Sequence, residues 1–506
     1  MALPTITNIV VLMLENRSYD NVLGMLYSAN NAFPYDAAPE GQTGLMGLSG
    51  AESNDLPNPP GGSITVMAAV GDSSSSPPLL PTMIPAIDPG EGFADMAQQI
   101  LGLDEPDTTT NPYTGPAGTY GAMGGFVANY LRQSRDGTPS SPAQIMMYLT
   151  PEMMPTTAFL ANNFMVCDGW FGSVPSNTWA NRLFSVCAAS GTWTAGGTQY
   201  SYIDDLEYFP GEHGAMPVFL AEKRLVLPSV FSQLDAVLGV VQKNARGAPF
   251  PSWKVYFHDY SNIDALLQYV STQFHDPASL NLGQYDTSDF TSATTLLANK
   301  QFTTFQQDLA AGTLAPFTLI EPRYCNNFPL GGVQGNEVQS NHPGVQAYVN
   351  LPGSRTSPQI DAQYGEQLLL DVYTQLRGST YWWSTLLIVV YDEHGGCYDH
   401  VPPITTMIPP SPTNPASYVG FDFTVSGPRV PALIVSPFAF PGSTLRAPAG
   451  KVFDHTSIIK TVWECFDLNS GPHAATSLND RDGAAASVLD GLSEIIVNGT
   501  GLPNVT

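Results

Sequence analysis

The chain has 506 residues, 18 lysines and arginines, and a formal net charge of −26. Only 12% of its residues are charged, about half of the usual share. Because proteins that bind a nucleic-acid backbone or an anionic membrane surface need clustered positive charge, the composition argues against both classes.

The first part of the chain contains one clear strand signal. Residues 6–14 are a continuous apolar run rich in β-branched side chains, typical of a strand buried on both faces of a parallel sheet. Residues 30–90 are rich in Gly, Pro, Ser, Asn and Asp, and predict a long loop that could serve as a lid. The sequence patterns of residues 195–345 are mixed and are compatible with a small subdomain. We expect residues 1–506 to form a single elaborated domain.

The second part of the chain alternates between helical and strand patterns. Residues 362–377 carry apolar side chains at helical spacing, and residues 385–391 repeat the buried-strand pattern. A third apolar run follows at 431–436, and 455–466 predicts a helix for which Asp454 is the expected N-cap. Helices that alternate with buried strands predict an α/β fold with a largely parallel central sheet.

Oxygen-bearing side chains follow two of the predicted strands. Glu15 and Asn16 come directly after the first strand, and Asp392 and Glu393 come directly after 385–391. Because the carboxyl ends of parallel strands meet at one edge of a sheet, the fold could bring these four residues together. An all-oxygen set suits Ca²⁺, Mg²⁺ or Mn²⁺ better than a structural zinc site. Acids at strand ends are also often solvated loop residues or helix caps, so this signal alone leaves both interpretations open.

The segment 392–400, DEHGGCYDH, concentrates ionisable groups in a chain that is poor in charge. It holds Asp392, Glu393, His394, Asp399 and His400 around two adjacent glycines, which allow a tight turn and a close approach of the backbone to a ligand. This density favours a functional loop over a polar loop with incidental histidines.

The segment 173–182, SVPSNTWANR, has the pattern of a hydroxyl-rich loop that enters a helix. A hydroxyl at a helix N-terminus lies beside free backbone N–H groups and the positive end of the helix dipole, which can bind phosphate and support an alkoxide nucleophile. Ordinary capping by Ser176 or Thr178 explains these residues equally well on their own. His455, His342 and His258, each taken alone, are more typical of structural histidines.

The five cysteines are far apart, odd in number and without a CxxC pair, which excludes zinc-finger chemistry. We expect them to be mostly buried thiols that act as small apolar side chains, with one disulfide still open.

Several segments together resemble one protein family. The chain is similar to the bacterial phospholipase C and acid phosphatase A phosphoesterase family, which also includes plant non-specific phospholipases C. The likeness runs from residue 9 to about residue 482, and its most specific parts are ENRSYD and DEHGGCYDH. The segments that carry it occur in the family's order: 13–24, 88–93, 154–184, 320–324, 341–344, 391–403, 429–437 and 454–462.

The resemblance implies a fold and a set of roles. It implies an α/β/α sandwich of the alkaline phosphatase superfamily and one bound divalent cation, with Ca²⁺ or Mg²⁺ favoured and Zn²⁺ or Mn²⁺ also open. Thr178 matches the family's nucleophile, which also touches the metal. The implied metal ligands are Glu15, Asn16, Asp392, Glu393 and Thr178, and the implied contacts to phosphate or leaving group are His342, His258, His394 and His455.

The chain departs from the family at one position of the segment 88–91. The family usually has a histidine facing the phosphate where this chain has Glu91. A carboxylate there would repel a phosphate dianion unless it were protonated or bound to a metal. Smaller departures are Cys397 in place of an aromatic residue and Ala180 in place of proline.

From these residues we predict metal-dependent hydrolysis of phosphate esters through a phosphothreonine intermediate, of acid phosphatase or phospholipase C type. A non-catalytic, cation-dependent binding protein on the same scaffold is the alternative from another class. A sulfatase is disfavoured because the segment 173–177 lacks the arginine of the sulfatase element, and a serine esterase is disfavoured because the chain has no G-x-S-x-G elbow.

The expected substrate is a small phosphate ester or a phospholipid. No apolar run approaches the ~18 residues of a transmembrane helix, so we expect no such segment. The N-terminus shows no basic region followed by an apolar stretch and a cleavage site, so we expect no secretory signal in this sequence. The family resemblance implies a secreted or periplasmic protein, and the oligomeric state is open.

Overall fold

A computed structural model gives the fold of the chain. It describes residues 5–26, 46–57, 61–76, 78–103, 109–115, 122–133, 139, 141–204, 227–258, 261–263, 281–285, 302–324, 338–344, 360–411 and 415–498.

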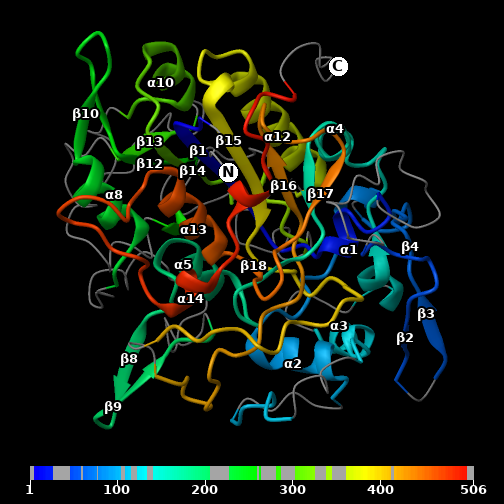
Figure 1. The fold of residues 1–506 in the computed structure, drawn as a ribbon. Helices are drawn as coiled ribbons and strands as arrows, with labels where there is room; N and C mark the ends of the chain where they lie inside the picture. Colours follow the sequence, from blue (N-terminus) through cyan, green and yellow to red (C-terminus); the bar gives the residue numbers. More distant parts are fainter. Residues whose placement is uncertain are drawn as a thin grey trace.

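A mostly parallel sheet forms the centre of the molecule (Figure 1). Its strand order is β13-β12-β14-β1-β15-β16-β6-β17. The strands are β1 (Asn8–Leu14), β6 (Met165–Cys167), β12 (Trp253–Phe257), β13 (Leu282–Gln284), β14 (Phe317–Ile320), β15 (Thr385–Tyr391), β16 (Ala432–Val435) and β17 (Ser443–Leu445). The predicted parallel α/β architecture is confirmed.

The two longest strands of this sheet, β1 and β15, are those that the sequence predicted from unbroken apolar runs. Every residue of both strands is buried, because helices cover both faces of the sheet and leave no solvated side. They pair in parallel from Asn8 and Thr385 to Leu14 and Tyr391. This register makes both strands end at the same edge, directly before Glu15 and Asp392.

The third predicted strand, β16, runs against its neighbours. It pairs antiparallel with both β15 and β6, whereas the other pairings of this sheet among the described residues are parallel. A short apolar run shows burial but not direction, because strand direction depends on how the connection 392–431 returns to the sheet.

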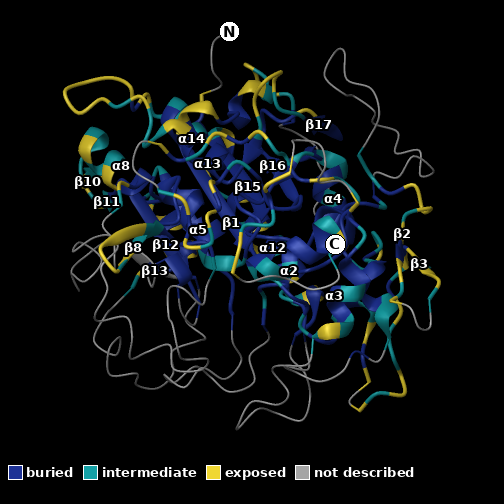
Figure 2. Cartoon of the chain, turned by 90° about the horizontal axis from the view of Figure 1, so that it is seen from below, coloured by how far each residue is buried: buried dark blue, intermediate teal, exposed yellow. Residues whose placement is uncertain are grey.

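Helices pack on the two faces of the sheet. One group contains α4 (Pro155–Asn163), α10 (Phe305–Ala311) and α12 (Ala362–Arg377). The other contains α5 (Thr178–Cys187), α8 (Val230–Leu238), α13 (Thr456–Cys465) and α14 (Asp480–Ala484). Figure 2 shows α13 and α14 on one side of the buried strands and α12 on the other. The chain is an α/β/α sandwich.

Two of the helices were predicted closely, and one detail of a cap was wrong. Helix α12 has the predicted limits 362–377. Helix α13 begins after His455, which is its N-cap residue, rather than after Asp454. The Asp454 carboxylate still accepts a hydrogen bond from the backbone N–H of Thr456 at 3.0 Å. Asp454 therefore caps a backbone N–H at the start of the helix, although it lies one position before the N-cap residue.

A second apolar cluster lies outside the main core and is built largely from residues 46–148. The elements within residues 46–148 are β2 (Ser53–Asp55), β3 (Ser63–Thr65), β4 (Met67–Ala68), β5 (Met147–Tyr148), α2 (Phe93–Leu101), α3 (Phe126–Arg132), η1 (Pro81–Met83) and η2 (Pro142–Met146). Of these, η1 packs against the main core. The expected loop 30–90 therefore contains short strands where it is described, and residues 30–45 lie outside the described part. A lid role stays a prediction.

The remaining elements are short. They are α1 (Tyr19–Val22), β7 (Trp170–Phe171), β8 (Thr192–Ala195), β9 (Thr198–Ser201), β10 (Val241–Lys243), β11 (Pro249–Pro251), β18 (Phe453–Asp454), η4 (Trp382–Ser384) and η5 (Val488–Gly491). Within the range 195–345, β12, β13 and β14 are strands of the central sheet. The division into one domain and a subdomain stays a prediction.

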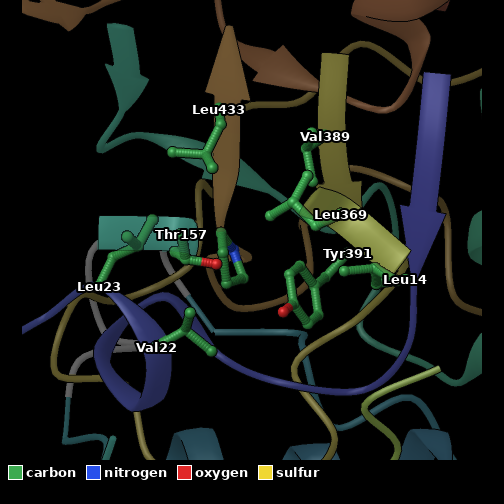
Figure 3. Close-up of a pocket in the computed structure, with 9 residues that line it drawn as sticks. Leu14, Val22, Leu23, Thr157, Leu369, Val389, Tyr391 and Leu433 are labelled. Carbon is green, nitrogen blue, oxygen red and sulfur yellow. The ribbon is translucent and has the colours of Figure 1, made fainter. Parts of the chain in front are cut away.

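The core is closely packed around the strands. A cavity of about 10 Å³ lies beside β1, β15 and β16 (Figure 3), and it has room for about one water molecule at most. Its lining is almost entirely apolar and includes Leu14, Leu369 and Leu433, so it is a packing defect rather than a substrate site.

The cysteines within the described residues are free thiols. Cys167, Cys187 and Cys397 are buried and Cys465 is partly buried, as the sequence predicted, while Cys325 lies outside the described residues. In the part of the chain that the structure covers, no helix is long and apolar enough to cross a membrane.

Candidate active site

The ends of β1 and β15 place the four predicted oxygen ligands at one edge of the sheet. The backbone N–H groups of Asn16 and Glu393 both donate to Asp392 Oδ1, at 3.1 and 2.8 Å. Glu15 is 6% exposed, Glu393 is 2% exposed, and Asn16 and Asp392 are fully buried. The structure therefore brings together side chains that are more than 370 positions apart in the sequence.

The adjacent glycines of the segment 392–400 make this close approach possible. Gly395 and Gly396 both have a positive φ, 61° and 63°, which L-residues rarely adopt. A Cβ atom on Gly395 would lie 1.8 Å from the Asn16 carbonyl oxygen, and one on Gly396 would lie 2.5 Å from Pro89 Cβ. The turn thus packs the end of β15 against both the end of β1 and the segment 88–91.

Thr178 is the first residue of α5, as the loop-to-helix pattern predicted. The loop before it is held by Asn181, which accepts from the Val174 N–H at 3.1 Å and donates to the Ser176 carbonyl at 2.6 Å. The Thr178 hydroxyl lies 3.5 Å from Asn16 Oδ1, and Thr178 is partly exposed. A hydroxyl at a helix N-terminus is therefore presented beside the strand-end ligands, on a side that solvent reaches.

Arg182, one helical turn after Thr178, is a functional candidate that sequence reasoning missed. Its Nε donates to Asp392 Oδ2 at 2.9 Å, and its terminal nitrogens lie 3.7 Å from Glu15 Oε1 and 3.6 Å from Glu321 Oε1. The side chain is fully buried. The available signal was its place four residues after Thr178 in a chain with few basic residues, because positions i and i+4 share one face of a helix.

The buried charges of this edge are not balanced. Burial raises the pKa of Glu15 to about 7, with Asp392 adding to the rise, while Arg182 and His342 oppose it. The carboxylates of Glu15, Asp392 and Glu321 surround the one guanidinium of Arg182. An excess of buried negative charge with oxygen donors fits a hard divalent cation.

A second group, Asp88, Glu91 and His342, lies beside these ligands, and its potential ligand atoms are within 4.8 Å of one another. His342 Nε2 is 3.6 Å from Glu91 Oε1, and His342 Nδ1 is 3.9 Å from Asp88 Oδ1. Burial acts to lower the pKa of His342, but Glu91, Asp88 and Glu15 outweigh it and raise the pKa to about 9. Asn16 Nδ2 donates to Glu91 Oε1 at 2.7 Å, which ties this group to the end of β1.

Asp88 was missed as a candidate, and the glycine of the NHPG segment explains how it comes close to His342. Gly344 has φ 87°, and a Cβ atom there would lie 2.7 Å from the Asp88 backbone and side chain. The positive φ and the missing side chain let the His342 loop and the Asp88 segment touch.

The other three candidate histidines are fully buried and hydrogen-bonded within the protein. His258 Nδ1 donates to the Glu321 carbonyl at 3.1 Å. His394 Nε2 contacts Gln99 Oε1 at 2.8 Å, and burial lowers the pKa of His394 to about 3. His455 Nε2 donates to the Asp392 carbonyl at 2.5 Å, and burial lowers the pKa of His455. These contacts place the three rings around the site, where they support its backbone and side chains.

The sequence pattern of the Phosphoesterase family matches residues 6–469 of this chain. The chain therefore belongs to the Phosphoesterase family and is a phosphoric ester hydrolase. This membership argues against the alternative of a non-catalytic, cation-dependent binding protein.

Named relatives cover most of the chain. Non-specific phospholipase C6 from Arabidopsis thaliana is 29% identical over 503 residues, which are 98% of this chain and 74% of that protein. Phospholipase C A from Mycobacterium tuberculosis is 26% identical over 478 residues, which are 91% of this chain and 72% of that protein.

Two solved structures show a more distant likeness. A protein in the alkaline phosphatase superfamily from Vibrio parahaemolyticus aligns with a TM-score of 0.30 and 12% identity, over 62% of this chain and 60% of that chain. The lipoteichoic acid synthase LtaP from Listeria monocytogenes aligns with a TM-score of 0.31 and 15% identity, over 67% of this chain and 70% of that chain.

Proposed function

We propose that the chain hydrolyses phosphate esters with a divalent cation and a covalent intermediate on Thr178. The observation that carries this proposal is the position of the Thr178 hydroxyl. It stands at the N-terminus of α5, 3.5 Å from Asn16 Oδ1 and beside a buried set of carboxylates. A helix N-terminus offers backbone N–H groups to phosphoryl oxygens, where charge develops during the reaction.

The residues that would hold the cation are Glu15, Asn16, Asp392, Glu393 and Thr178. A divalent cation held there would polarise the phosphoryl group and lower the pKa of the Thr178 hydroxyl. Ca²⁺ or Mg²⁺ suits the all-oxygen donors best, and Mn²⁺ or Zn²⁺ remains open to the test below.

In the proposed reaction the Thr178 oxygen attacks phosphorus in line with the leaving alcohol. The hydroxyl passes its proton to solvent water, and the bond from phosphorus to the leaving oxygen breaks. The leaving oxygen takes a proton from His342, and a phosphothreonine forms. Arg182 keeps the ends of β1 and β15 in register with Thr178 through its contacts with Glu15 and Asp392. Water then hydrolyses the phosphothreonine and restores Thr178.

His342 is our candidate for the acid that protonates the leaving alcohol. It is partly exposed, whereas His258, His394 and His455 are fully buried and hydrogen-bonded within the protein around the site. The neighbouring carboxylates of Glu91 and Asp88 favour its protonated form. A general acid must be protonated at working pH and accessible to the substrate, and the raised pKa and partial exposure of His342 fit both requirements.

We further propose that the natural substrate is a phosphodiester of the phospholipase C type. The relatives that cover most of the chain are named phospholipases C. The acidic pair Asp88 and Glu91 beside the site also disfavours a dianionic monoester more than a monoanionic diester.

The test compares three substrates with the purified full chain: p-nitrophenyl phosphate, p-nitrophenyl phosphorylcholine and phosphatidylcholine. Each is assayed with EDTA and with EDTA followed by excess Mg²⁺, Ca²⁺, Mn²⁺ or Zn²⁺. We expect turnover of the two diesters, release of intact phosphocholine from the lipid, and loss of activity with EDTA. Turnover of the monoester alone would make the chain an acid phosphatase, and full activity in EDTA would reject the cation.

A further inference from the structure

The side-chain amide of Asn16 is oriented by the contact with Glu91. Asn16 Nδ2 donates to Glu91 Oε1 at 2.7 Å, and Asn16 Oδ1 lies on the side of Thr178, 3.5 Å from its hydroxyl. Glu91 Oε1 is the acceptor in this contact, so the amide nitrogen of Asn16 is the atom that faces Glu91. The amide oxygen is thereby directed toward Thr178 and the strand-end carboxylates.

The rest of Asn16 is already fixed by other contacts. Its backbone adopts φ 59°, its N–H donates to Asp392 Oδ1 at 3.1 Å, and its carbonyl packs against Gly395. The rotation of the side-chain amide is therefore the freedom that Glu91 restricts. An amide turned by half a rotation would point two N–H donors at the cation site, where donors repel a cation.

Glu91 is itself held by a rigid segment. Gln99 Nε2 donates to the Gly90 carbonyl at 2.7 Å, and Gly396 packs against Pro89 and Gly90. The backbone before Glu91 is thus held by contacts with α2 and with the turn after β15. These contacts fix the position of Glu91 beside Asn16. His342 Nε2 lies 3.6 Å from the same oxygen of Glu91, so this carboxyl group has a neighbour on a second side.

We propose that Glu91 is a positioning residue that keeps the Asn16 amide oxygen directed at the cation and at Thr178. This role rests on the proposed function, because it assigns Asn16 to the cation. It gives the carboxylate at position 91 a task that does not involve contact with phosphate. Outer partners that orient a metal ligand typically affect metal affinity by about 10- to 100-fold.

The test is a double-mutant cycle on cation binding. The full chain is stripped with a chelator, and its affinity for Mn²⁺ is measured by titration calorimetry for wild type, Glu91→Ala, Asn16→Ala and the double variant. We expect Glu91→Ala to weaken binding by roughly tenfold or more in the wild type. In the Asn16→Ala background the same change should have less than about a twofold effect, because the amide that Glu91 orients is gone.

Two further variants separate orientation from charge and from folding. Asp88→Asn removes one negative charge from the same group without removing the partner of Asn16, and it should weaken Mn²⁺ binding less than Glu91→Gln does. Glu91→Gln keeps the shape of the side chain, but its amide no longer forces the nitrogen of Asn16 to face it. The visible absorption bands of the Co²⁺-loaded chain should shift in Glu91→Gln and stay unchanged in Asp88→Asn.

The outcomes are distinct. Equal losses from Glu91→Ala in both backgrounds, or equal losses from Glu91→Gln and Asp88→Asn, would overturn the positioning role and leave only a charge effect. If the wild type binds Mn²⁺ and hydrolyses esters while Glu91→Ala binds Mn²⁺ equally well, only this role fails. If the wild type takes up none of the divalent cations, the proposed function fails as well.

Discussion

Two buried acidic clusters, each built around one arginine, lie at the ends of the same strands, yet they differ in how their charges are satisfied. We define the Arg182 cluster as Arg182, Glu15, Asp392 and Glu321, and the Arg429 cluster as Arg429, Asp20, Asp399 and His400. Each takes one acid from the segment that follows β1 and another from the segment 392–400. Both contain carboxylates of the kind that bind metal ions.

The Arg429 cluster is closed by hydrogen bonds. Arg429 Nε donates to Asp399 at 3.0 Å, and its terminal nitrogens donate to Asp20, Asp399 and two backbone carbonyls at 2.7–3.2 Å. The guanidinium also lies 4.3 Å from the centre of the Tyr19 ring. Its charge and all of its nitrogens are therefore used within the protein, as expected of a structural ion pair.

The Arg182 cluster is open by comparison. Arg182 makes one short bond, from Nε to Asp392, while its terminal nitrogens stand 3.6–3.7 Å from Glu321 and Glu15. A partly exposed hydroxyl, Thr178, lies beside it. Acidic composition therefore does not identify a cation site. The two clusters differ in the arginine: all three nitrogens of Arg429 donate hydrogen bonds, whereas only Nε of Arg182 does.

The largest expected effect concerns Thr178, the hydroxyl beside the Arg182 cluster. Thr178→Ala should lower turnover of p-nitrophenyl phosphorylcholine by roughly a thousandfold or more, because no nucleophile remains. Circular dichroism and Mn²⁺ titration should show a folded chain that still binds the cation. Ser176→Ala is the matched control and should retain most of the activity. Appreciable turnover by Thr178→Ala, with loss in Ser176→Ala, would transfer the nucleophile to Ser176.

The next effect contrasts one aspartate from each cluster. Asp392→Asn should weaken divalent-cation binding by roughly a hundredfold or more and lower activity with it, because a direct ligand should matter more than an outer partner. Asp399→Asn should leave the bound metal content, measured by mass spectrometry of the purified chain, close to one ion per chain. Equal metal loss from the two variants would erase the distinction between the clusters.

A third prediction compares the two arginines. Arg429→Met should lower the free energy of unfolding by about 3–5 kcal/mol, because it leaves Asp20 and Asp399 buried without their partner. Arg182→Met should also destabilise the chain, but added Mn²⁺ should restore part of the loss because a cation can compensate Glu15 and Asp392. Urea unfolding with and without Mn²⁺ measures both. A rise in the free energy of unfolding of Arg429→Met on addition of Mn²⁺ would contradict a closed Arg429 cluster.

The smallest effect is the pH dependence of the Arg429 cluster. Burial raises the pKa of Asp399 from 3.8 to about 6, Asp20 adds to the rise, and Arg429 opposes it. Because the folded chain binds this proton more tightly than the unfolded chain does, its contribution to stability is full below 3.8 and is lost as pH rises through about 6.

The loss over that range should be about 1–3 kcal/mol. Urea unfolding of the metal-free chain at several pH values should show it, and Asp399→Asn should flatten that part of the curve. A free energy of unfolding that rises through this range, with no difference between wild type and Asp399→Asn, would reject the assignment.

Much of the sheet and part of the site were readable from local patterns. The unbroken apolar runs at 6–14 and 385–391 predicted β1 and β15, because strands covered on both faces must be apolar throughout. The acids that follow them were predicted to meet, and the parallel register brings them together. The loop-to-helix pattern at 173–182 placed Thr178 at the start of α5. The catalytic and metal-binding roles of these residues stay predictions.

Other features depended on contacts that no local pattern records. The antiparallel direction of β16 is set by the path of a long connection, and the contact of Glu91 with Asn16 depends on the turn at Gly395 and Gly396. The segment 392–400 predicted a functional loop, and Asp399 and His400 were counted among its ionisable residues. Only the three-dimensional position of Arg429 shows that they belong to a closed ion pair.

The sequence by itself determined the family, the main strands, and the residue types available for the chemistry, because apolar periodicity and motif order are local properties of the chain. The tertiary structure decided which acids share an arginine and how completely that arginine is hydrogen-bonded, because hydrogen bonding between distant residues depends on how the strands, turns and helices meet. That arrangement separates the Arg182 cluster from the Arg429 cluster, and it places Glu91 beside the amide that it is proposed to orient.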